Sequence, residues 1–300
     1  MRNAMMDKNY KYVKIIVICC LIGFIVMLFL YWQNNGITTT TYNYENSKLP
    51  VSFNGFTIVQ VSDLHNKNFK GTLTQKIIEA HPDIIVITGD LIDSRRTSIP
   101  DAMVLIESLK DVAPIYYVSG NHEQRSPAFD ALKQALSKQG VQLMDGKYTR
   151  LEKSGESIGL LGIADPQSRL SEYYDAYKND SEYVLKTVES IFQVNTIRTD
   201  FNILLSHRPE LAKAYTQSQM DLVFTGHAHG GQVRLPFLGG IVAPNQGFFP
   251  KWTEGIHPFN GSGNHITSMI VSRGLGNSIV PIRIFNHPEL VVVKLHRGGL

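Results

Sequence analysis

Cysteine is nearly absent from this chain, and the few cysteines that it has are adjacent. The 300 residues include two cysteines, Cys19 and Cys20. This count excludes a scaffold stapled by several disulfides and a zinc cluster built from cysteine thiolates. Charged side chains are also scarce, at 18% of the residues against the roughly 25% usual for soluble domains, whereas hydrophobic residues make up 43%. A disordered chain has the opposite balance, so the sequence predicts a folded protein with ample material for a core.

An excess of positive charge is absent from most of the chain, although the net charge is +3. Four of the 29 basic side chains but only one of the 26 acidic ones lie in residues 1–32, so the remaining chain carries 25 of each. A formally neutral body lacks the basic surplus that phosphate backbones favour. We therefore expect no nucleic acid as a partner, and nothing in the sequence indicates an obligate protein partner.

One long apolar run lies near the amino terminus. Residues 15–32 carry no charge, and a helix of that length would span about 27 Å, close to the hydrocarbon thickness of a bilayer. The basic residues before it favour a cytoplasmic amino terminus, and Tyr31 and Trp32 suit the far interface. We expect a cytoplasmic flank at 1–14, a transmembrane anchor at 15–32 and a polar tether at 33–49. The protein would then be a single-pass cell-membrane protein whose catalytic domain is extracytoplasmic.

A cleaved signal peptide is the alternative for this segment. Its apolar region usually has about 7–15 residues and ends in a small-residue cleavage site. Here the run is longer and continues into Gln33-Asn34-Asn35 without an A-x-A pattern. An uncleaved anchor is therefore favoured. Cys19 and Cys20 lie inside the run and are interpreted as lipid-facing side chains.

The rest of the chain alternates between strand-like and helix-like segments. Such alternation predicts layered α/β architecture, with one domain over residues 50–297 and a core between two sheets. Helices are expected at 72–80, 102–109, 129–138 and 168–192. Strands are expected at 56–62, 84–88, 114–119, 141–144, 148–151, 157–163, 201–205, 222–225, 265–272, 281–285 and 290–295.

Polar side chains follow the ends of five predicted strands. Ligands bind at the carboxyl ends of strands in layered α/β folds because the loops converge there. Five of the ten histidines of the chain lie at these ends. The residues concerned are Asp63, His65, Asp90, Asn121, His122, His207, His227 and His229.

These residue types suit a pair of metal ions. Carboxylates and imidazoles bind Zn, Fe, Mn and related metals, and a carboxylate such as Asp90 is able to bridge two ions about 3.5–4 Å apart. Each motif alone has an ordinary interpretation, because D-x-H occurs in turns and a single histidine is most often a surface or core residue. The ordered set favours a metal site, whereas its identity as Mn, Fe, Zn or Ni stays open.

The ordered motifs resemble the calcineurin-like metallophosphoesterase superfamily. The matching blocks are Asp63-Leu-His65, Gly89-Asp-Leu-Ile-Asp93, Gly120-Asn-His-Glu123, Ser206-His207 and Gly226-His-Ala-His229. Further segments resemble its bacterial membrane-associated branch, namely Gly230-Gly-Gln232, Arg234-Leu-Pro236, Gln246-Gly-Phe-Phe-Pro-Lys251, Ser272-Arg-Gly-Leu-Gly276 and Pro281-Ile-Arg283.

The resemblance implies an α/β/β/α sandwich, with two packed mixed β-sheets flanked by helices, around a dinuclear centre. In that case Asp63, His65 and His229 would hold the first divalent ion. The second ion would be held by Asn121, His207 and His227, with Asp90 bridging the two. His122 would not be a ligand and would lie near the leaving-group oxygen.

The expected activity is hydrolysis of a phosphate ester by hydroxide generated at the metal ions, with His122 assisting the leaving group. A phosphodiester or a lipid-linked pyrophosphate is the favoured substrate, because of the anchor and the apolar segment 235–252. That segment either packs in the core or forms an apolar rim that contacts lipid. Arg95 and Arg96 would bind substrate phosphate or form an exposed pair of loop charges.

Two other functions are weighed against this one. A phosphomonoesterase acting on soluble nucleotides or sugar phosphates would use the same ligands. A non-enzymatic metal-binding ectodomain would be expected to lack a ligand or His122, and all eight positions are occupied by the expected residue types.

Overall fold

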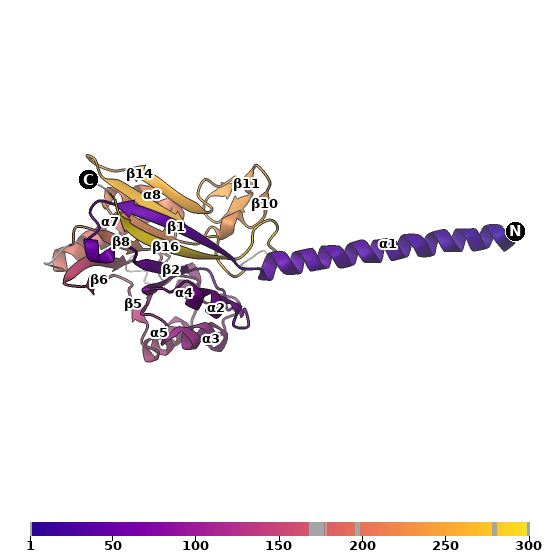
Figure 1. Cartoon of the computed structure of the whole chain (residues 1–300), viewed down its shortest axis with the longest axis horizontal. Coiled ribbons are helices and arrows are strands. Elements are labelled where there is room, and N and C mark those ends of the chain that lie inside the picture. The colour runs from indigo at the N-terminus through magenta and orange to yellow at the C-terminus, as the bar shows by residue number, and fades with distance from the viewer. Residues whose placement is uncertain (1, 168–176, 178, 196–198, 278–280, 299–300) are drawn as a thin grey trace.

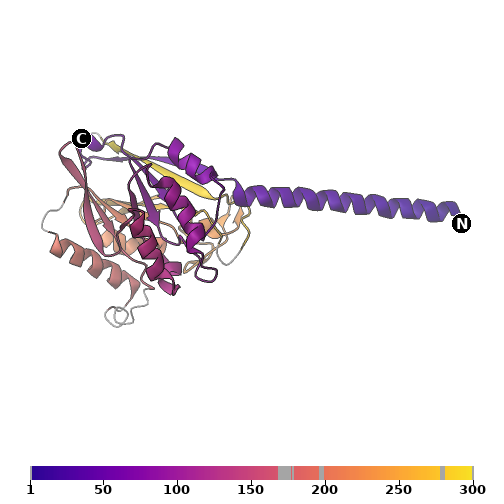
Figure 2. The same ribbon diagram turned by 90° about the horizontal axis from the view of Figure 1, so that it is seen from below.

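A long helix projects from one end of a β-rich body in the computed structural model (Figures 1 and 2). The structure describes residues 2–167, 177, 179–195, 199–277 and 281–298. The projecting helix, α1 (Arg2–Asn35), contains a segment, Tyr10–Asn35, that is long and apolar enough to cross a membrane. Its apolar side chains are largely exposed, so nothing within the described body covers them.

The first sheet has six strands and brings the two ends of the domain together. The four strands from the third position to the far edge of this sheet are parallel to one another. Helices α2 (Thr72–Glu79) and α3 (Ile99–Leu109) return the chain between successive strands, as parallel pairing requires. The carboxyl-terminal strand is antiparallel to β2 and parallel to β1. The strand order is β1 (Thr38–Asn46), β16 (Glu289–Arg297), β2 (Thr57–Val61), β3 (Ile84–Thr88), β4 (Ile115–Val118) and β5 (Gln142–Leu143).

The second sheet also has six strands and is mixed. Parallel pairs form its centre, whereas the strand pair at each side is antiparallel. The strand order is β14 (Gly255–Asn260), β15 (Ile266–Val271), β9 (Leu222–Thr225), β8 (Asn202–Leu205), β7 (Glu156–Gly162) and β6 (Lys147–Lys153). Two short hairpins follow β9, formed by β10 (Arg234–Leu235) with β11 (Gly239–Gly240) and by β12 (Val242–Ala243) with β13 (Gly247–Phe248).

Alternating side chains of the strands divide the interior into three apolar layers. Ile58 of β2 and Ile203 of β8 lie in one buried cluster between the sheets. The next residue along each strand faces outward, since Val59 packs with the helices over the first sheet and Leu204 with those over the second. The helices are α2, α3 and α5 (Phe129–Lys138) on one side, and α7 (Asp180–Val194) and α8 (Ala212–Gln217) on the other. This arrangement confirms the predicted four-layer sandwich.

The predicted polar tether at 33–49 is corrected by the structure. Residues 38–46 form β1, which pairs with β16 from Thr38 opposite Glu289 to Asn46 opposite Arg297. Tyr44 is buried against Phe201, with ring centroids 6.1 Å apart. The segment looked like a linker because it is polar. As an edge strand it needs only one apolar face, and its tyrosine side chains supply that face.

The remaining predicted elements match the structure with two exceptions. The predicted strand 281–285 is wrong, because Ile284 makes only an isolated bridge with Val233. The predicted helix 168–192 is found from Asp180 onward, as α7, and its earlier part lies largely outside the described residues. Neither β14 nor the short hairpins had a clear alternating pattern, and they were not predicted.

Candidate metal centre

The eight predicted site residues all follow strand ends that meet between the two sheets. Asp63 and His65 follow β2, Asp90 follows β3, and Asn121 and His122 begin the short helix α4 (Asn121–Arg125) after β4. His207 follows β8, and His227 and His229 follow β9. All eight are buried. The first sheet therefore contributes five of the eight residues and the second sheet three, so neither sheet completes the cluster alone.

Five of these residues have a backbone conformation that ordinary side chains avoid. Their φ angles lie between 48° and 63°, in the left-handed region, where each non-glycine residue costs about 1–2 kcal/mol. Such strain persists only where surrounding contacts enforce it, and it concentrates at functional sites. The five residues are Asp63, His65, Asp90, His227 and His229.

The first group of donor atoms comes from Asp63, His65 and His229. The two histidine Nε2 atoms are 3.2 Å apart, and His229 Nε2 is 3.3 Å from Asp63 Oδ1. Asp63 is held from behind, because its carboxylate accepts hydrogen bonds from Ser62 Oγ at 2.6 Å and from the His227 backbone N–H at 3.1 Å. These contacts aim one carboxylate oxygen and two ring nitrogens at a common point.

The second group comes from Asn121, His207 and His227. His207 Nε2 lies 3.2 Å from both Asn121 Oδ1 and His227 Nδ1. The other ring nitrogen, His207 Nδ1, donates to the Thr88 carbonyl at 2.7 Å. That bond fixes the tautomer and leaves Nε2 as a lone-pair donor toward the cluster, as in known metal sites.

Asp90 belongs to both groups. Its Oδ2 atom is 3.6 Å from His65 Nε2 and 3.3 Å from His207 Nε2, whereas Oδ1 accepts the His122 backbone N–H at 2.8 Å. The donor atoms of Asp63, His65, Asp90 and His229 lie within 4.8 Å of one another, as do those of Asp90, His207 and His227. One carboxylate is thus shared between two donor groups.

Two glycines give these carboxylates their space. A Cβ at Gly120 would lie 2.3 Å from Asp90 Oδ1, and one at Gly226 would lie 2.3 Å from Asp63 Oδ2. Real Cβ atoms do not approach an oxygen so closely. The glycines in the G-N-H-E and G-H-A-H motifs are therefore required by packing against the ligand carboxylates.

Burial controls the electrostatics of the cluster. Burial lowers the pKa of His65 to about 4 and lowers the pKa values of His227 and His229 below the ordinary histidine range. Burial also acts to lower the pKa of His207, but the adjacent Asp90 carboxylate outweighs it and raises that pKa to about 10. Neutral imidazole is the form that binds metals, so three of the four histidines are poised to act as ligands.

The donor set fits two divalent metal ions. Donor atoms that share an ion at bond lengths of about 2.0–2.2 Å lie roughly 3–3.5 Å apart, and the spacings within each group match that range. Two lone-pair nitrogens at 3.2 Å, such as His65 Nε2 and His229 Nε2, repel each other unless a cation or a proton lies between them. The nitrogen, carboxylate and amide donors do not distinguish Mn, Fe, Zn and Ni.

His122 lies beside the cluster, and its ring is oriented by the loop after β3. Its Nδ1 atom accepts the Ser94 backbone N–H at 3.0 Å, so in the neutral ring the proton is on Nε2. Its ring meets that of His65 edge-on, with centroids 4.6 Å apart. A neutral imidazole with a fixed N–H is suited to donate a hydrogen bond to an oxygen of a bound substrate.

Two carboxylates in the quoted motifs have roles that the sequence interpretation missed. Asp93 Oδ2 lies 3.6 Å from His65 Nδ1 and 3.8 Å from His122 Nδ1. Glu123 accepts the backbone N–H groups of Asp90, Ile92 and Gly120 at 2.8–3.0 Å, and burial raises its pKa to about 8. Glu123 therefore ties the loop after β3 to the loop after β4. Both residues were visible as the last positions of G-D-x-x-D and G-N-H-E.

Arg95 and Arg96 are exposed and are not part of the buried cluster. Their backbone N–H groups bond to Asp93 Oδ1, and the Arg95 guanidinium is 3.7 Å from the same oxygen. The loop therefore holds both arginines near the site without directing them into it. A more deeply buried arginine, Arg208, directly follows His207 and pairs with Asp165 at 2.7 Å.

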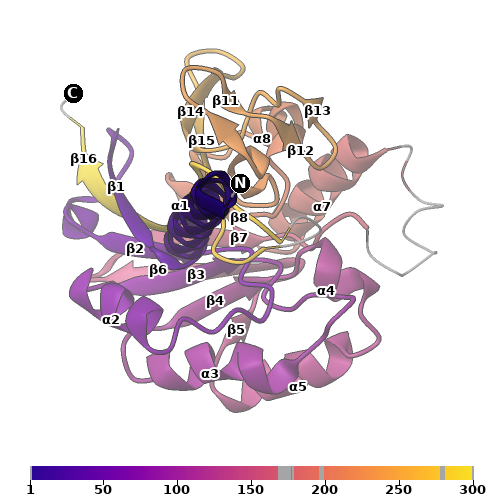
Figure 3. The ribbon, with the colours of Figure 1, turned by 90° about the vertical axis from the view of Figure 1, so that its right-hand side faces the viewer.

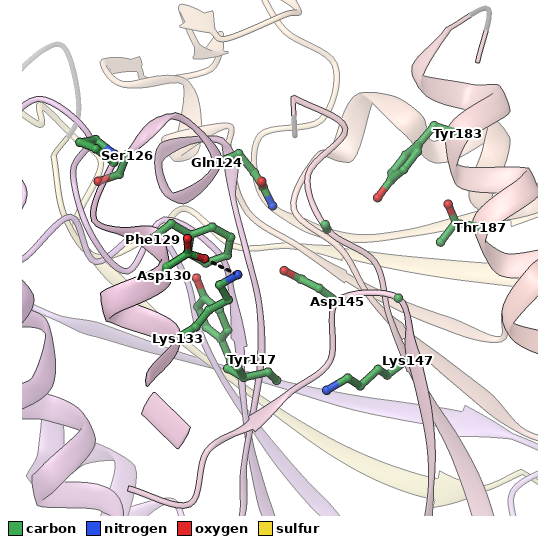
Figure 4. A pocket seen from close by; sticks show the side chains of 14 residues that line it. Tyr117, Gln124, Ser126, Phe129, Asp130, Lys133, Asp145, Lys147, Tyr183 and Thr187 are labelled. Carbon is green, nitrogen blue, oxygen red and sulfur yellow. Dashed lines mark ion pairs between the residues drawn. The ribbon is translucent and has the colours of Figure 1, made fainter. Parts of the chain in front are cut away.

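A separate cavity of about 540 Å³ lies between α5, the β5–β6 connection and α7 (Figure 4). In the close-up, Lys133 and Asp130 on α5 lie on one side, and Tyr183 and Thr187 on α7 lie on the other. None of the eight predicted site residues lines it. It is connected to the site indirectly, because Asp145 in its wall accepts a hydrogen bond at 2.6 Å from Ser119, which precedes Gly120 and Asn121.

Comparison with known proteins agrees with this geometry. The family model for calcineurin-like phosphoesterases matches residues 56–231. The chain belongs to the calcineurin-like phosphoesterase family. It is therefore a metal-dependent phosphoric ester hydrolase, as the motifs predicted, and the matched residues contain every strand end that supplies the cluster.

Individual relatives cover most of the chain. An uncharacterized metallophosphoesterase of Bacillus subtilis, YkuE, is 30% identical over 88% of this chain and 87% of its own length. A transmembrane protein with a metallophosphoesterase domain from Danio rerio is 29% identical over 84% of this chain, which spans 55% of that protein. Among solved structures, the NAD nucleotidase of Haemophilus influenzae resembles this chain with a TM-score of 0.49 and 12% identity, covering 73% of this chain and 45% of that one.

Proposed function

We propose that this chain is a membrane-anchored phosphoesterase with a dinuclear metal centre, acting on a phosphodiester or a lipid-linked pyrophosphate. The sharing of Asp90 between two donor groups carries the proposal, because a bridging carboxylate is what a two-metal site requires. Asp63, His65 and His229 would hold one ion and Asn121, His207 and His227 the other. The ions would be drawn from Mn, Fe, Zn and Ni.

The ions, when bound, would neutralise phosphoryl charge and bring the pKa of water close to neutrality. The protein's part in the reaction is positional. The buried carboxylates and imidazoles are held by Ser62, Thr88 and Glu123, so they need no rearrangement when substrate arrives. The closed packing around them excludes bulk water and strengthens every charge interaction in the site.

His122 would assist the leaving group. Its Nε2–H is defined by the bond that Nδ1 accepts from Ser94. As the bond from phosphorus to the leaving oxygen breaks, the Nε2–H of the neutral ring would donate a hydrogen bond to that oxygen and stabilise its developing negative charge. Solvent water would then supply the proton that completes the leaving alcohol.

Anchoring in a membrane is supported by α1 and by a relative. The segment Tyr10–Asn35 has the length and composition of a membrane span, and the similar protein of Danio rerio is named as a transmembrane protein. The basic residues before the apolar run favour a cytoplasmic amino terminus and an extracytoplasmic catalytic domain. Arg95 and Arg96, held near the site by Asp93, would attract an anionic substrate.

The test is a substrate panel on the purified full chain in detergent. Bound metals are measured first, by inductively coupled plasma mass spectrometry. Hydrolysis of p-nitrophenyl phosphate, bis(p-nitrophenyl) phosphate and a polyprenyl pyrophosphate is then compared before and after chelation. We expect two equivalents of divalent metal and faster hydrolysis of the diester or the lipid pyrophosphate. Preferential hydrolysis of the monoester would favour the soluble-phosphate alternative, and metal binding without any hydrolysis would favour a non-enzymatic ectodomain.

A further inference from the structure

The hairpins after β9 expose large apolar side chains at the end of the body from which α1 projects. Phe237 is 107% exposed, Leu238 65%, Phe248 77% and Phe249 67%. The same segment is not exposed throughout, since Ala243 is buried and Trp252 packs against Phe259 with ring centroids 5.9 Å apart. Residues 235–252 were expected either to pack in the core or to form an apolar rim. The structure shows both, with core packing at the base of the hairpins and exposed apolar side chains at their tips.

These tips lie on the face beside α1. Figure 1 shows β10 and β11 at the end of the body where α1 begins to project. Figure 3, which faces that end, shows β11 and β12 next to α1 and β13 farther out. The contacts agree with this view. The backbone N–H of Arg234 in β10 donates to the Ile284 carbonyl at 3.0 Å, so the first hairpin is attached to the segment that receives α1.

The end of α1 is fixed on that receiving segment. Asn34 Oδ1 accepts the Arg283 backbone N–H at 2.9 Å, and the Trp32 ring lies 4.5 Å from the His287 ring. Phe29 contacts Phe285, with ring centroids 5.6 Å apart. Several contacts from consecutive turns hold the helix in one direction relative to the body, and that direction orients the domain on any membrane that α1 crosses.

The contact between Phe29 and Phe285 sets the depth. Phe29 lies three residues inside the end of the uncharged run at Trp32, or about 4.5 Å along the helix axis. A side chain of the body that touches Phe29 must therefore reach the boundary of the apolar layer. Phe285 does so and is 51% exposed. The body cannot be separated from the bilayer by a layer of water on this side.

Hydrogen bonds link the metal site to the same face. Asn245, in the β12–β13 hairpin, lies 3.5 Å from His227 Nε2. Asn286, next to Phe285, donates to the His229 carbonyl at 2.7 Å, and its own backbone N–H donates to Gln33 of α1 at 3.2 Å. His227 is thus in contact with the hairpin through Asn245, and His229 is linked to the end of α1 through Asn286.

We propose that Phe237, Leu238, Phe248, Phe249 and Phe285 form a membrane-docking surface that inserts into the lipid headgroup boundary and holds the metal centre against the bilayer. Exposed aromatic and aliphatic side chains at such a boundary gain the free energy of leaving water, and a contiguous group of them on a soluble face would otherwise favour aggregation. The proposal deepens the proposed function, on which it rests, because it selects substrates whose phosphate lies at headgroup depth.

Depth measurements on the full chain test the surface independently of catalysis. Cys19→Ala and Cys20→Ala remove the native thiols. A single cysteine is then introduced by Phe248→Cys, Val51→Cys or Leu21→Cys, and it carries a nitrobenzoxadiazole label. Val51 is the matched control, since it is 64% exposed and lies beyond the far end of β1. The protein is reconstituted in vesicles of phosphatidylcholine and phosphatidylglycerol at 3:1, with brominated phosphatidylcholine as quencher.

We expect the label at position 248 to lose roughly half or more of its fluorescence, as a group about 5–10 Å inside the headgroup boundary would, and the label at 51 to stay unquenched. The label at position 21 reports on α1 itself. Quenching at 21 without quenching at 248 would overturn the docking surface and leave the anchor intact. Absence of quenching at all three positions would overturn both.

An activity readout adds a second arm. Phe237→Ser with Phe248→Ser should lower hydrolysis of a p-nitrophenyl diester of diacylglycerol phosphate in these vesicles about tenfold, because two interfacial side chains are lost. Hydrolysis of soluble bis(p-nitrophenyl) phosphate should be unchanged, and Val51→Ser should affect neither substrate. Equal loss on both substrates would contradict docking. If the unaltered chain hydrolyses neither, the catalytic proposal fails while the label measurement still decides the surface.

Discussion

The metal centre and the hairpin tips are two regions that each reverse the usual placement of side chains. The centre buries carboxylates and imidazoles, whereas the tips expose phenylalanine and leucine. Folded proteins avoid both arrangements unless a compensating partner is present. In the centre the proposed partner is a pair of cations, and at the tips the proposed partner is a lipid surface. Buried ionisable side chains and exposed apolar side chains thus both indicate where this chain would bind a ligand or a surface.

The two regions also differ in how firmly the rest of the protein holds them. Asp63, Asp90 and His207 are each fixed by further hydrogen bonds from backbone or hydroxyl groups. Phe237 lies in the turn between β10 and β11, and Phe248 lies in the two-residue strand β13. Neither contributes to the buried apolar clusters among the described residues. Changes at the centre should therefore alter chemistry and stability, and changes at the tips should alter only membrane contact.

The largest effect is expected from Asp90→Asn, because it removes the carboxylate that both donor groups share. We expect loss of bound metal and a decrease in diester hydrolysis of at least about 10³-fold. Metal content and kcat/KM for bis(p-nitrophenyl) phosphate are the measurements. Asp111→Asn, at an exposed position, is the matched control. Full hydrolysis by an Asp90→Asn protein that has lost its metal would refute the assigned site.

His122→Ala should reduce the rate while metal stays bound, since His122 lies beside the donor groups and is not expected to be a ligand. The expected loss in kcat is about 10²–10⁴-fold for an alkyl ester and less for a p-nitrophenyl ester, whose leaving group needs little protonation. Parallel rate and metal measurements on the two esters check this. An equal loss on both, or loss of metal, would show that His122 acts in another way.

Asn286→Ala tests the connection between the two regions. The side chain donates to the His229 and Gln232 carbonyls at 2.7 and 2.9 Å. Its removal takes a donor from both buried carbonyls, of which that of His229 keeps the Gln232 backbone N–H at 3.0 Å. The free energy of unfolding should fall by about 1–3 kcal/mol, measured by thermal or denaturant unfolding. Asn264→Ala, at an exposed position, is the control. A decrease no larger than that of the control would mean that Asn286 does not support the His229 loop.

The smallest effect on stability is expected at the tips. Phe248→Ser should change the free energy of unfolding by less than about 0.5 kcal/mol in detergent, because the side chain is 77% exposed. Phe224→Ala, in the core between the sheets, should cost about 3–5 kcal/mol. Chemical denaturation of both variants provides the comparison. A large destabilisation by Phe248→Ser would show that the tip packs against the protein and not against lipid.

Much of the fold and of the site could be predicted from local sequence. Apolar runs such as Ile84–Thr88, each followed by Asp, Asn or His, identified the strands and the residues at their ends. The polar strand β1 could not be predicted, because its stability comes from pairing with β16, more than 240 residues away in the chain. Asp93 and Glu123 stood in the motifs, but only their contacts with His65, His122 and the loop amides show what they do.

The family chemistry, the apolar segment and the kinds of ligand could be predicted from the amino-acid sequence, because these depend on residue type and short spacing. Only the tertiary structure decided that Asp90 faces both donor groups, that α1 is fixed to residues 283–287 and that the hairpin tips are exposed beside it. The physical reason is that each of these depends on side chains meeting across two sheets or across the whole chain. Such distances are set by packing of the sandwich and not by any local pattern.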